Sequence, residues 1–243
     1  MPLTLAELAI HIPAAVELFE KYDFNYYENG TQNFKTACTE KGLVFEDIDA
    51  ELNSLQSTSK ASSFYNLQDM SIERLIDFIN GQYHNNEAET LAVIHTYIQQ
   101  LITDANDDDD ELLATIKAIE INFVKLQDTL LTHCKNEDKI LFPYLRKLND
   151  LHSHTATLPK GHFNSVAKNP IRMLEAEHTE AATILMQIKK TANNYIVPPH
   201  APEQYATLMQ HLQSFEKDLH MHLHLENNIL FPKFIAAEQA LTK

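Results

Sequence analysis

The sequence predicts an all-α protein, in which an antiparallel four-helix bundle follows a small helical N-terminal domain. Three observations favour this fold class. Only 4 glycines occur among 243 residues, Val/Thr-rich alternating stretches typical of strands are absent, and four long stretches carry apolar residues at helical spacing. A chain of this length can bury a substantial core. Four long helices joined by loops are typical of an antiparallel bundle.

The chain divides at a short Ser/Thr-rich stretch that has no apolar periodicity. Such a composition is typical of linkers. The expected parts are a small helical N-terminal domain at residues 1–56, a linker at residues 57–68 and the four-helix bundle at residues 69–243. Because a domain of about 55 residues has a marginal core, we expect it to dock on another surface, of this chain or of a partner.

The small domain is expected to contain several short helices. Thr4 can cap the first, Pro13 can occupy the first turn of the second, and Asn29-Gly30 marks a turn. Residues 31–40 and 45–55 are expected to form two more helices.

The four bundle helices are delimited by caps, prolines and loops. The third follows a loop at residues 152–168 and begins at Asn169-Pro170, a favourable cap with a first-turn proline; Val197-Pro198-Pro199 stops it. Acidic residues 107–111 lie at the start of the second helix, where their charge is favourable at the positive end of the helix dipole. They lack the spaced oxygens and the central glycine of a calcium-binding loop. The second is expected to bend near Pro143. The expected helices span residues 71–103, 110–147, 169–195 and 202–240.

Charge and cysteine content limit the function. The formal net charge of −15 argues against nucleic acid or an anionic membrane as a main partner, because both bind basic surfaces. No stretch approaches the roughly 20 apolar residues that span a bilayer, and no signal segment is recognised. Cys38 and Cys134 are too few for a disulfide framework or a thiolate metal site and are interpreted as reduced thiols. These features predict a soluble, cytoplasmic protein.

A phrase with the pattern His-x3-Glu-x2-Ile-Leu-Phe-Pro occurs twice, at residues 133–143 and 222–232. On a helix, a His and a Glu four residues apart project from one face. Each pair can therefore coordinate one metal ion, and the two pairs together can coordinate two metal ions. The shared Ile-Leu-Phe-Pro is expected to close the site with core residues, the proline bending each helix.

Heptad spacing places a histidine in or beside the apolar seam of every bundle helix. Glu137 and Glu226 follow theirs by one turn, and a carboxylate in an apolar seam is costly unless it is paired or binds a cation. Taken alone, His84 or His178 would more often be a hydrogen-bonded structural residue. Two matched pairs favour metal instead. The predicted ligands are His84, His133, Glu137, His178, His222 and Glu226. The seam expected in the second helix comprises Ile119, Phe123, Leu126, Leu130, His133, Glu137, Ile140 and Tyr144.

Most of the other histidines are interpreted as structural or surface residues. His220 and His224 flank His222 by two positions and are expected to point away from the seam. His95 and His211 lie roughly on the core sides of their helices, where they could act as outer partners of the ligands.

The predicted ligand set favours two iron ions. A closed structural zinc site needs four ligands in total, and calcium needs more oxygens. Shared between two ions, the set gives each metal two imidazoles and two bridging carboxylates, with room for an oxo or hydroxo bridge and an exchangeable position. Such ligation suits iron, with manganese or zinc as substitutes. A ferritin-like site uses Glu-x2-His twice, but that spacing occurs once, at Glu175 and His178, so a haemerythrin-like arrangement fits better.

Nearly the whole chain resembles the di-iron proteins of iron–sulfur cluster repair, also called repairers or regulators of iron centres. The resemblance rests on the repeated phrase, on Glu175-x-Glu177-His178, on Tyr83-His84 and on the N-terminal pattern from Leu8 to Asp23. It implies that His84, His133, His178 and His222 are iron ligands and that Glu137 and Glu226 are bridging carboxylates.

Two departures from the family pattern stand out. Members typically carry Cys-Cys-Gly-Gly where this chain has Tyr27-Glu28-Asn29-Gly30, so a thiol-dependent role of the small domain is not expected. Glu87 stands where relatives often have another His.

The resemblance implies repair or protection of iron–sulfur clusters damaged by nitric oxide or oxidative stress. A labile bridge between the two glutamates could let iron leave for a damaged cluster. Damaged iron–sulfur proteins would be its partners, and nitric oxide or dioxygen would be its small ligands. Whether the protein forms a homodimer stays an open question. Two alternatives remain: a haemerythrin-like sensor or carrier of dioxygen or nitric oxide, and an enzyme that reduces nitric oxide to nitrous oxide at the two irons. A reversible dioxygen adduct would indicate a carrier, whereas rapid oxidation would favour repair or reduction.

Overall fold

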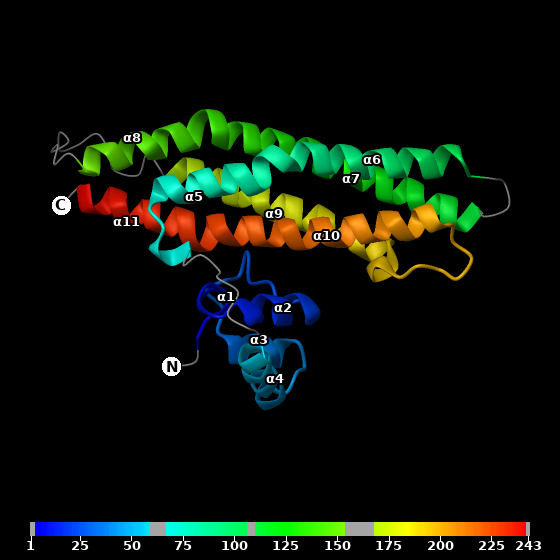
Figure 1. Cartoon of the computed structure of the whole chain (residues 1–243), viewed down its shortest axis with the longest axis horizontal. Coiled ribbons are helices and arrows are strands. Elements are labelled where there is room, and N and C mark those ends of the chain that lie inside the picture. The colour runs from blue at the N-terminus through cyan, green and yellow to red at the C-terminus, as the bar shows by residue number, and fades with distance from the viewer. Residues whose placement is uncertain (1–2, 59–66, 106–109, 154–167, 242–243) are drawn as a thin grey trace.

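The computed structural model of the protein describes residues 3–58, 67–105, 110–153 and 168–241. Four long helical rods form an antiparallel bundle, and four short helices form a small domain beside one side of it (Figure 1). The all-α prediction and the four-helix bundle are confirmed. None of the described helices is long and apolar enough to cross a bilayer.

The small domain consists of α1 (Leu5–His11), α2 (Pro13–Lys21), α3 (Phe34–Glu40) and α4 (Phe45–Thr58). Both predicted starts are confirmed. Thr4 and Glu7 form a capping box, in which the Thr4 hydroxyl accepts from the Glu7 N–H at 3.2 Å and the Glu7 carboxylate accepts from the Thr4 N–H at 2.8 Å. Pro13 occupies the first turn of α2. The helix expected at 31–40 begins later, because the Asn33 side chain caps it by accepting from the Thr36 N–H.

The linker predicted at residues 57–68 overlaps the end of α4 and a short 3₁₀ turn, η1 (Leu67–Asp69), while residues 59–66 lie outside the described part. Most of the acidic run 107–111 and of the loop predicted at 152–168 also lie outside it.

The four rods follow the predicted ranges closely, although three of them contain an interruption. The first is α5 (Ile72–Ile79), η2 (Asn80–His84) and α6 (Asn85–Thr103); the second is α7 (Asp110–Asn136), η3 (Glu137–Leu141) and α8 (Phe142–Ser153); the third is α9 (Lys168–Thr191), followed by the short turn η4 (Asn193–Tyr195); the fourth is α10 (Glu203–Leu225), η5 (Glu226–Leu230) and α11 (Phe231–Leu241). The second rod extends past the predicted end, and the third begins one residue before the predicted cap.

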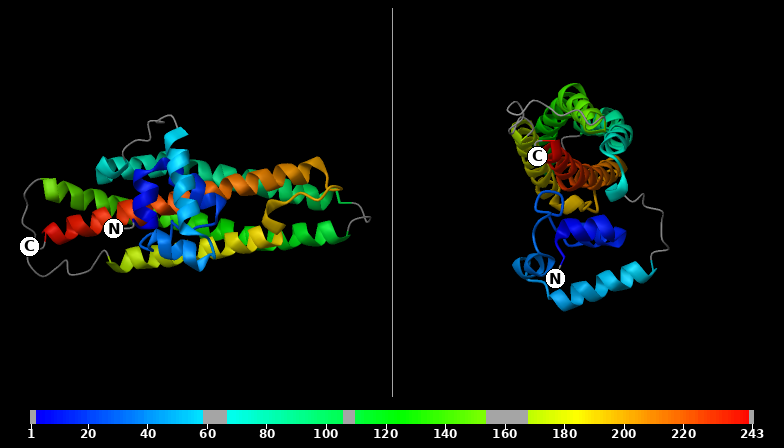
Figure 2. Two further views of the ribbon diagram at one scale, coloured as in Figure 1. Left: turned by 90° about the horizontal axis from the view of Figure 1, so that it is seen from below. Right: turned by 90° about the vertical axis from the view of Figure 1, so that its left-hand side faces the viewer.

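In the bundle, α7 packs between α6 and α9, and α10 closes the arrangement against α6 and α9. The end-on view of Figure 2 shows the rods surrounding one common axis. Two separate apolar clusters fill this axis: one contains Leu91, Phe123 and Leu212 in the half built by α6, α7, α9 and α10, and the other contains Ile76, Phe142 and Phe234 toward α5, α8 and α11. The candidate ligands lie between the two clusters, so a polar layer divides the core.

The interruptions η2, η3 and η5 are single π-helical turns at the level of this polar layer. In η3 the Phe142 N–H donates to the Glu137 carbonyl, five residues back. The proline that follows has no N–H. Because one backbone hydrogen bond of a regular α-helix is already missing there, widening the turn costs few further hydrogen bonds. π turns often occur at functional sites in helices.

The π turn at η3 overturns one seam assignment. Ile140, expected in the buried seam, is 67% exposed, and its neighbours Leu141 and Phe142 are buried instead. A π turn holds one residue more than an α turn, so every seam position after Glu137 moves along by one. Tyr144 is accordingly only partly buried, while Leu145 is fully buried.

Candidate metal centre

The structure brings all six predicted ligands into one buried layer. His84 ends η2, Glu137 begins η3 and Glu226 begins η5, so three of the six lie in or at the start of a π turn. His84 is 8% exposed and the other five are 1% exposed or less. Every rod contributes at least one imidazole. These groups therefore face one another across the bundle axis, away from bulk water.

The ligand atoms of the six residues form two groups, and both carboxylates belong to both groups. One group contains His84, Glu137, His222 and Glu226; the other contains His133, Glu137, His178 and Glu226; in each group the atoms lie within 4.8 Å of one another. Two metal positions bridged by two carboxylates would use this arrangement in full.

Individual distances fit cations in both positions. His84 Nε2 lies 3.1 Å from His222 Nε2, and His133 Nε2 lies 2.9 Å from His178 Nε2. Glu226 faces both groups, with Oε1 3.2 Å from His222 Nε2 and Oε2 3.1 Å from His178 Nε2. Two ring nitrogens that both lack a hydrogen repel unless a proton or a metal lies between them.

The carboxylate oxygens provide an independent test of the fit. Both oxygens of Glu137 and the Oε2 of Glu226 are buried without a hydrogen-bond partner in the described structure. Leaving a buried carboxylate oxygen unsatisfied is costly. A bound cation satisfies such oxygens directly, so the residues present fit a pair of metal ions.

The pKa shifts show strong electrostatic coupling in this layer. Burial by itself lowers the pKa of His133, but the surrounding carboxylates, Glu137 first, raise it well above its ordinary value. Burial disfavours the ionised form of Glu226, yet His222 and the other imidazoles hold the pKa of this carboxyl well below its usual range. The carboxylates thus favour positive charge within this layer, which protons supply in the metal-free chain and which bound cations would supply in their place.

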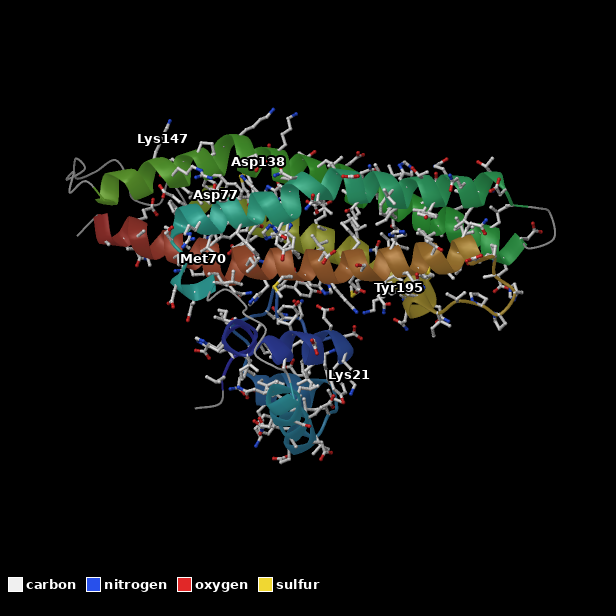
Figure 3. The ribbon with its side chains drawn as sticks, in the orientation of Figure 1. Lys21, Met70, Asp77, Asp138, Lys147 and Tyr195 are labelled. Atoms are coloured by element: carbon white, nitrogen blue, oxygen red, sulfur yellow. The ribbon has the colours of Figure 1, made fainter. Side chains whose placement is uncertain are left out.

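Three of the four imidazoles are oriented by an acceptor on a neighbouring rod. The Nδ1 atoms of His84, His133 and His178 lie 2.9, 2.9 and 2.8 Å from carboxylate or amide oxygens of Asp138, Glu177 and Asn227 respectively. Donation from Nδ1 leaves the lone pair on Nε2, directed at the centre of the layer. Asp138 lies on the second rod where it faces the first (Figure 3).

Comparison with known proteins agrees with this geometry. Residues 86–234 match the family model described as the hemerythrin HHE cation binding domain. The chain is 30% identical over 231 residues to a probable iron–sulfur cluster repair protein of Haemophilus influenzae, covering 95% of this chain and 96% of that protein. It is also 30% identical over 237 residues to the iron–sulfur cluster repair protein YtfE of Escherichia coli, covering 96% and 97%. The chain belongs to this hemerythrin-type iron–sulfur cluster repair family.

Sequence reasoning missed the outer acceptors of this family member. His95 and His211, the two candidates for outer partners, instead contact Phe123 and Tyr97, respectively, about three turns along their helices from the ligands. A signal was present in the repeated phrase, since the residue directly after each Glu, Asp138 or Asn227, is the acceptor in both copies.

His220 and His224 point away from the seam, as predicted, but they are buried under the small domain. His220 stacks on Tyr27 with ring centroids 3.9 Å apart and lies 3.0 Å from a Glu20 oxygen. His224 packs against Tyr26 with centroids 5.3 Å apart. These contacts fasten the small domain to α10.

A cavity of about 270 Å³ reaches the layer from the side of the first and fourth rods. Tyr83, Glu87, Asp218 and His222 are among its lining residues, and the Tyr83 ring stacks on His222. Glu87 is buried and accepts a hydrogen bond from the Cys134 thiol at 2.8 Å. The imidazole of His222 therefore lies at the wall of this cavity, with the Tyr83 ring against it.

Proposed function

We propose that this protein holds two iron ions and repairs or protects iron–sulfur clusters damaged by nitric oxide or oxidative stress, by donating iron to them. The observation that carries the proposal is the double use of Glu137 and Glu226, which belong to both groups of ligand atoms. The relatives named as iron–sulfur cluster repair proteins cover nearly the whole chain and supply the functional class.

In this proposal His84 and His222 hold one iron, His133 and His178 hold the other, and the two glutamates bridge them, with an oxo or hydroxo bridge completing the pair. Bound iron would supply open coordination positions, and the iron itself could be released to a damaged cluster. The protein orients the imidazoles through Nδ1 and encloses the layer between two apolar clusters that exclude water.

Metal stoichiometry tests the shared carboxylates. Removal of a bridging residue should weaken both positions, whereas removal of a histidine should weaken one. We expect about two irons per chain in the anaerobically purified protein, near none in Glu226→Ala, and about one in His84→Ala. Glu175→Ala is the matched control, because Glu175 is exposed on the same helix as His178. One zinc per chain, without oxo-bridged di-ferric absorption, would defeat the proposal.

Repair itself is tested with an iron–sulfur enzyme inactivated by nitric oxide. The iron-loaded protein should restore its activity and transfer iron in proportion, and the Glu226→Ala variant should do neither. If wild type and variant restored activity equally, donation from this site would be excluded.

A second candidate function is binding or reduction of a diatomic gas, and the cavity at His222 is the observation that favours it. A stable and reversible dioxygen adduct of the reduced protein would indicate a carrier or sensor. Nitrous oxide formed under turnover from nitric oxide would indicate a reductase. Rapid oxidation by dioxygen without nitrous oxide formation leaves repair as the function.

A further inference from the structure

Two consecutive asparagines of η5 fasten the small domain to the bundle. The Asn227 amide nitrogen donates to the Tyr27 carbonyl at 3.0 Å, and the Asn228 amide nitrogen donates to the Tyr26 carbonyl at 3.1 Å. The backbone approaches closely here, since a Cβ on Gly30 would lie 2.1 Å from the Asn228 Oδ1. The small domain and the metal layer therefore meet at one short segment of the fourth rod.

The other end of the Asn227 side chain reaches a predicted metal ligand. Its Oδ1 lies 2.8 Å from Nδ1 of His178. A backbone carbonyl can only accept, so the Tyr27 carbonyl requires the amide nitrogen on its side and turns the amide oxygen toward His178. His178 must then donate from Nδ1, and its Nε2, 3.1 Å from Glu226 Oε2, is left to bind metal.

We propose that Asn227 is a positioning residue that couples docking of the small domain to the metal ligand His178. This inference rests on the proposed metal site and adds a partner for one of its two positions. The Tyr27 carbonyl orients the amide, and the amide orients the imidazole. Docking of the small domain thus raises the metal affinity of the position formed by His133 and His178.

The other metal position has no such dependence. In the first copy of the repeated phrase the same place is taken by Asp138, which accepts from His84 at 2.9 Å. A carboxylate presents an acceptor whichever way it is rotated, so it needs no further group to orient it. The two positions of the pair are thereby made unequal, and only one responds to the small domain.

Docking does not depend on Asn227 alone. Glu20 lies 3.0 Å from His220 and the Tyr27 ring stacks on the same imidazole. Asp23 pairs with Lys189 of α9. Loss of the Asn227 amide should consequently leave the small domain in place, which allows the effect on His178 to be measured in the full chain.

The first test compares Zn²⁺ affinity of Asn227→Leu and Asn228→Leu by chelator competition. Asn227→Leu should weaken one of the two ions about tenfold or more, as is typical when the partner of a ligand is lost. Asn228→Leu removes the Asn228 bonds to the Tyr26 and Tyr27 carbonyls without touching a ligand. Its affinity should stay within about twofold of wild type, because the contacts of His220 and Lys189 keep the small domain docked. Equal losses in both variants, or none in Asn227→Leu, would overturn the proposal.

A second test distinguishes the loss of the acceptor for His178 from the loss of docking that orients this acceptor. Asn227→Asp keeps an acceptor for His178, so Zn²⁺ affinity should return to near the wild-type value. Gly30→Val, which forces the domain away from Asn228, should lower the affinity in the wild-type background and have no effect in the Asn227→Asp background. The same loss in both backgrounds would exclude transmission through Asn227.

Exchange of the ring N–H with water supplies a readout independent of affinity. With ¹⁵N-labelled histidine and Zn²⁺ bound, the Nδ1–H of His178 should exchange slowly in wild type and in Asn228→Leu and fast in Asn227→Leu, because Zn²⁺ on Nε2 keeps the proton on Nδ1 and only its acceptor is removed. An unchanged exchange rate in Asn227→Leu contradicts the coupling. A wild-type protein that bound no second ion would instead contradict the proposed two-metal function, so the two failures are distinguishable.

Discussion

His224 should make the stability of the protein fall on mild acidification. Its side chain is 2% exposed between α10 and the small domain, and Nδ1 accepts a hydrogen bond from the Asn228 amide at 3.0 Å. Burial lowers the pKa of His224 from the ordinary 6.5 to about 4. Protonation would bury a charge and break the bond from Asn228.

The magnitude follows from the two pKa values. The unfolded chain takes up a proton at His224 near pH 6.5, whereas the folded chain does so only near pH 4. The contribution of neutral His224 is therefore fully present above pH 6.5 and is lost as the pH falls from 6.5 to 4. A difference of this size corresponds to about 3 kcal/mol of unfolding free energy.

Urea unfolding of metal-free protein at several pH values between 7.5 and about 4 measures this contribution. Wild type should lose about 3 kcal/mol more than His224→Gln over this range, because glutamine does not titrate. The predicted metal ligands are the same in both proteins and cancel in the difference. His11→Gln, a change at an exposed histidine of α1, should follow wild type. Parallel curves for wild type and His224→Gln would refute the reasoning.

Two further predictions concern the π turn and the cysteines. Leu141→Ser should destabilise the protein by about 3 kcal/mol, whereas Ile140→Ser, at a position 67% exposed, should change stability by less than about 0.5 kcal/mol; the reverse order in urea titrations would refute the register of η3. Burial raises the pKa of Cys134 to about 12 and also raises the pKa of Cys38, so neither thiol should react with iodoacetamide at pH 8 until the protein is unfolded. Fast labelling of Cys134 in the folded protein would contradict its burial beside Glu87.

Much of the bundle could be predicted because its signal is repeated along each helix. Apolar residues that recur at helical spacing in α9, among them Ile171, Ala181 and Ile188, are buried as that spacing indicates. The same periodic argument failed at Ile140, because it assumes an unbroken α-helix. A π turn inserts one residue, and the hydrophobic pattern that precedes it does not indicate the insertion.

The small domain was predicted to dock somewhere, and the structure decides where. Its own caps at Thr4 and Asn33 are local features that the sequence displays. The surface that receives it is built by α9, α10 and η5, which lie far along the chain. Burial of His220 and His224 could not be foreseen from the fourth helix, since each lies outside the seam that its periodicity defines.

The sequence by itself determined the fold class and the residues that line the polar layer. The His-x3-Glu spacing, and the heptad spacing that places His84 and His178, both act within a single helix, whose geometry sets which side chains share a face. Only the tertiary structure decided which acceptor meets which imidazole. Asp138 and His84 are 54 residues apart, Glu177 and His133 are 44 apart, and Asn227 and His178 are 49 apart. Such pairs depend on the rotation and axial offset of two packed rods, and no pattern within one helix encodes either quantity.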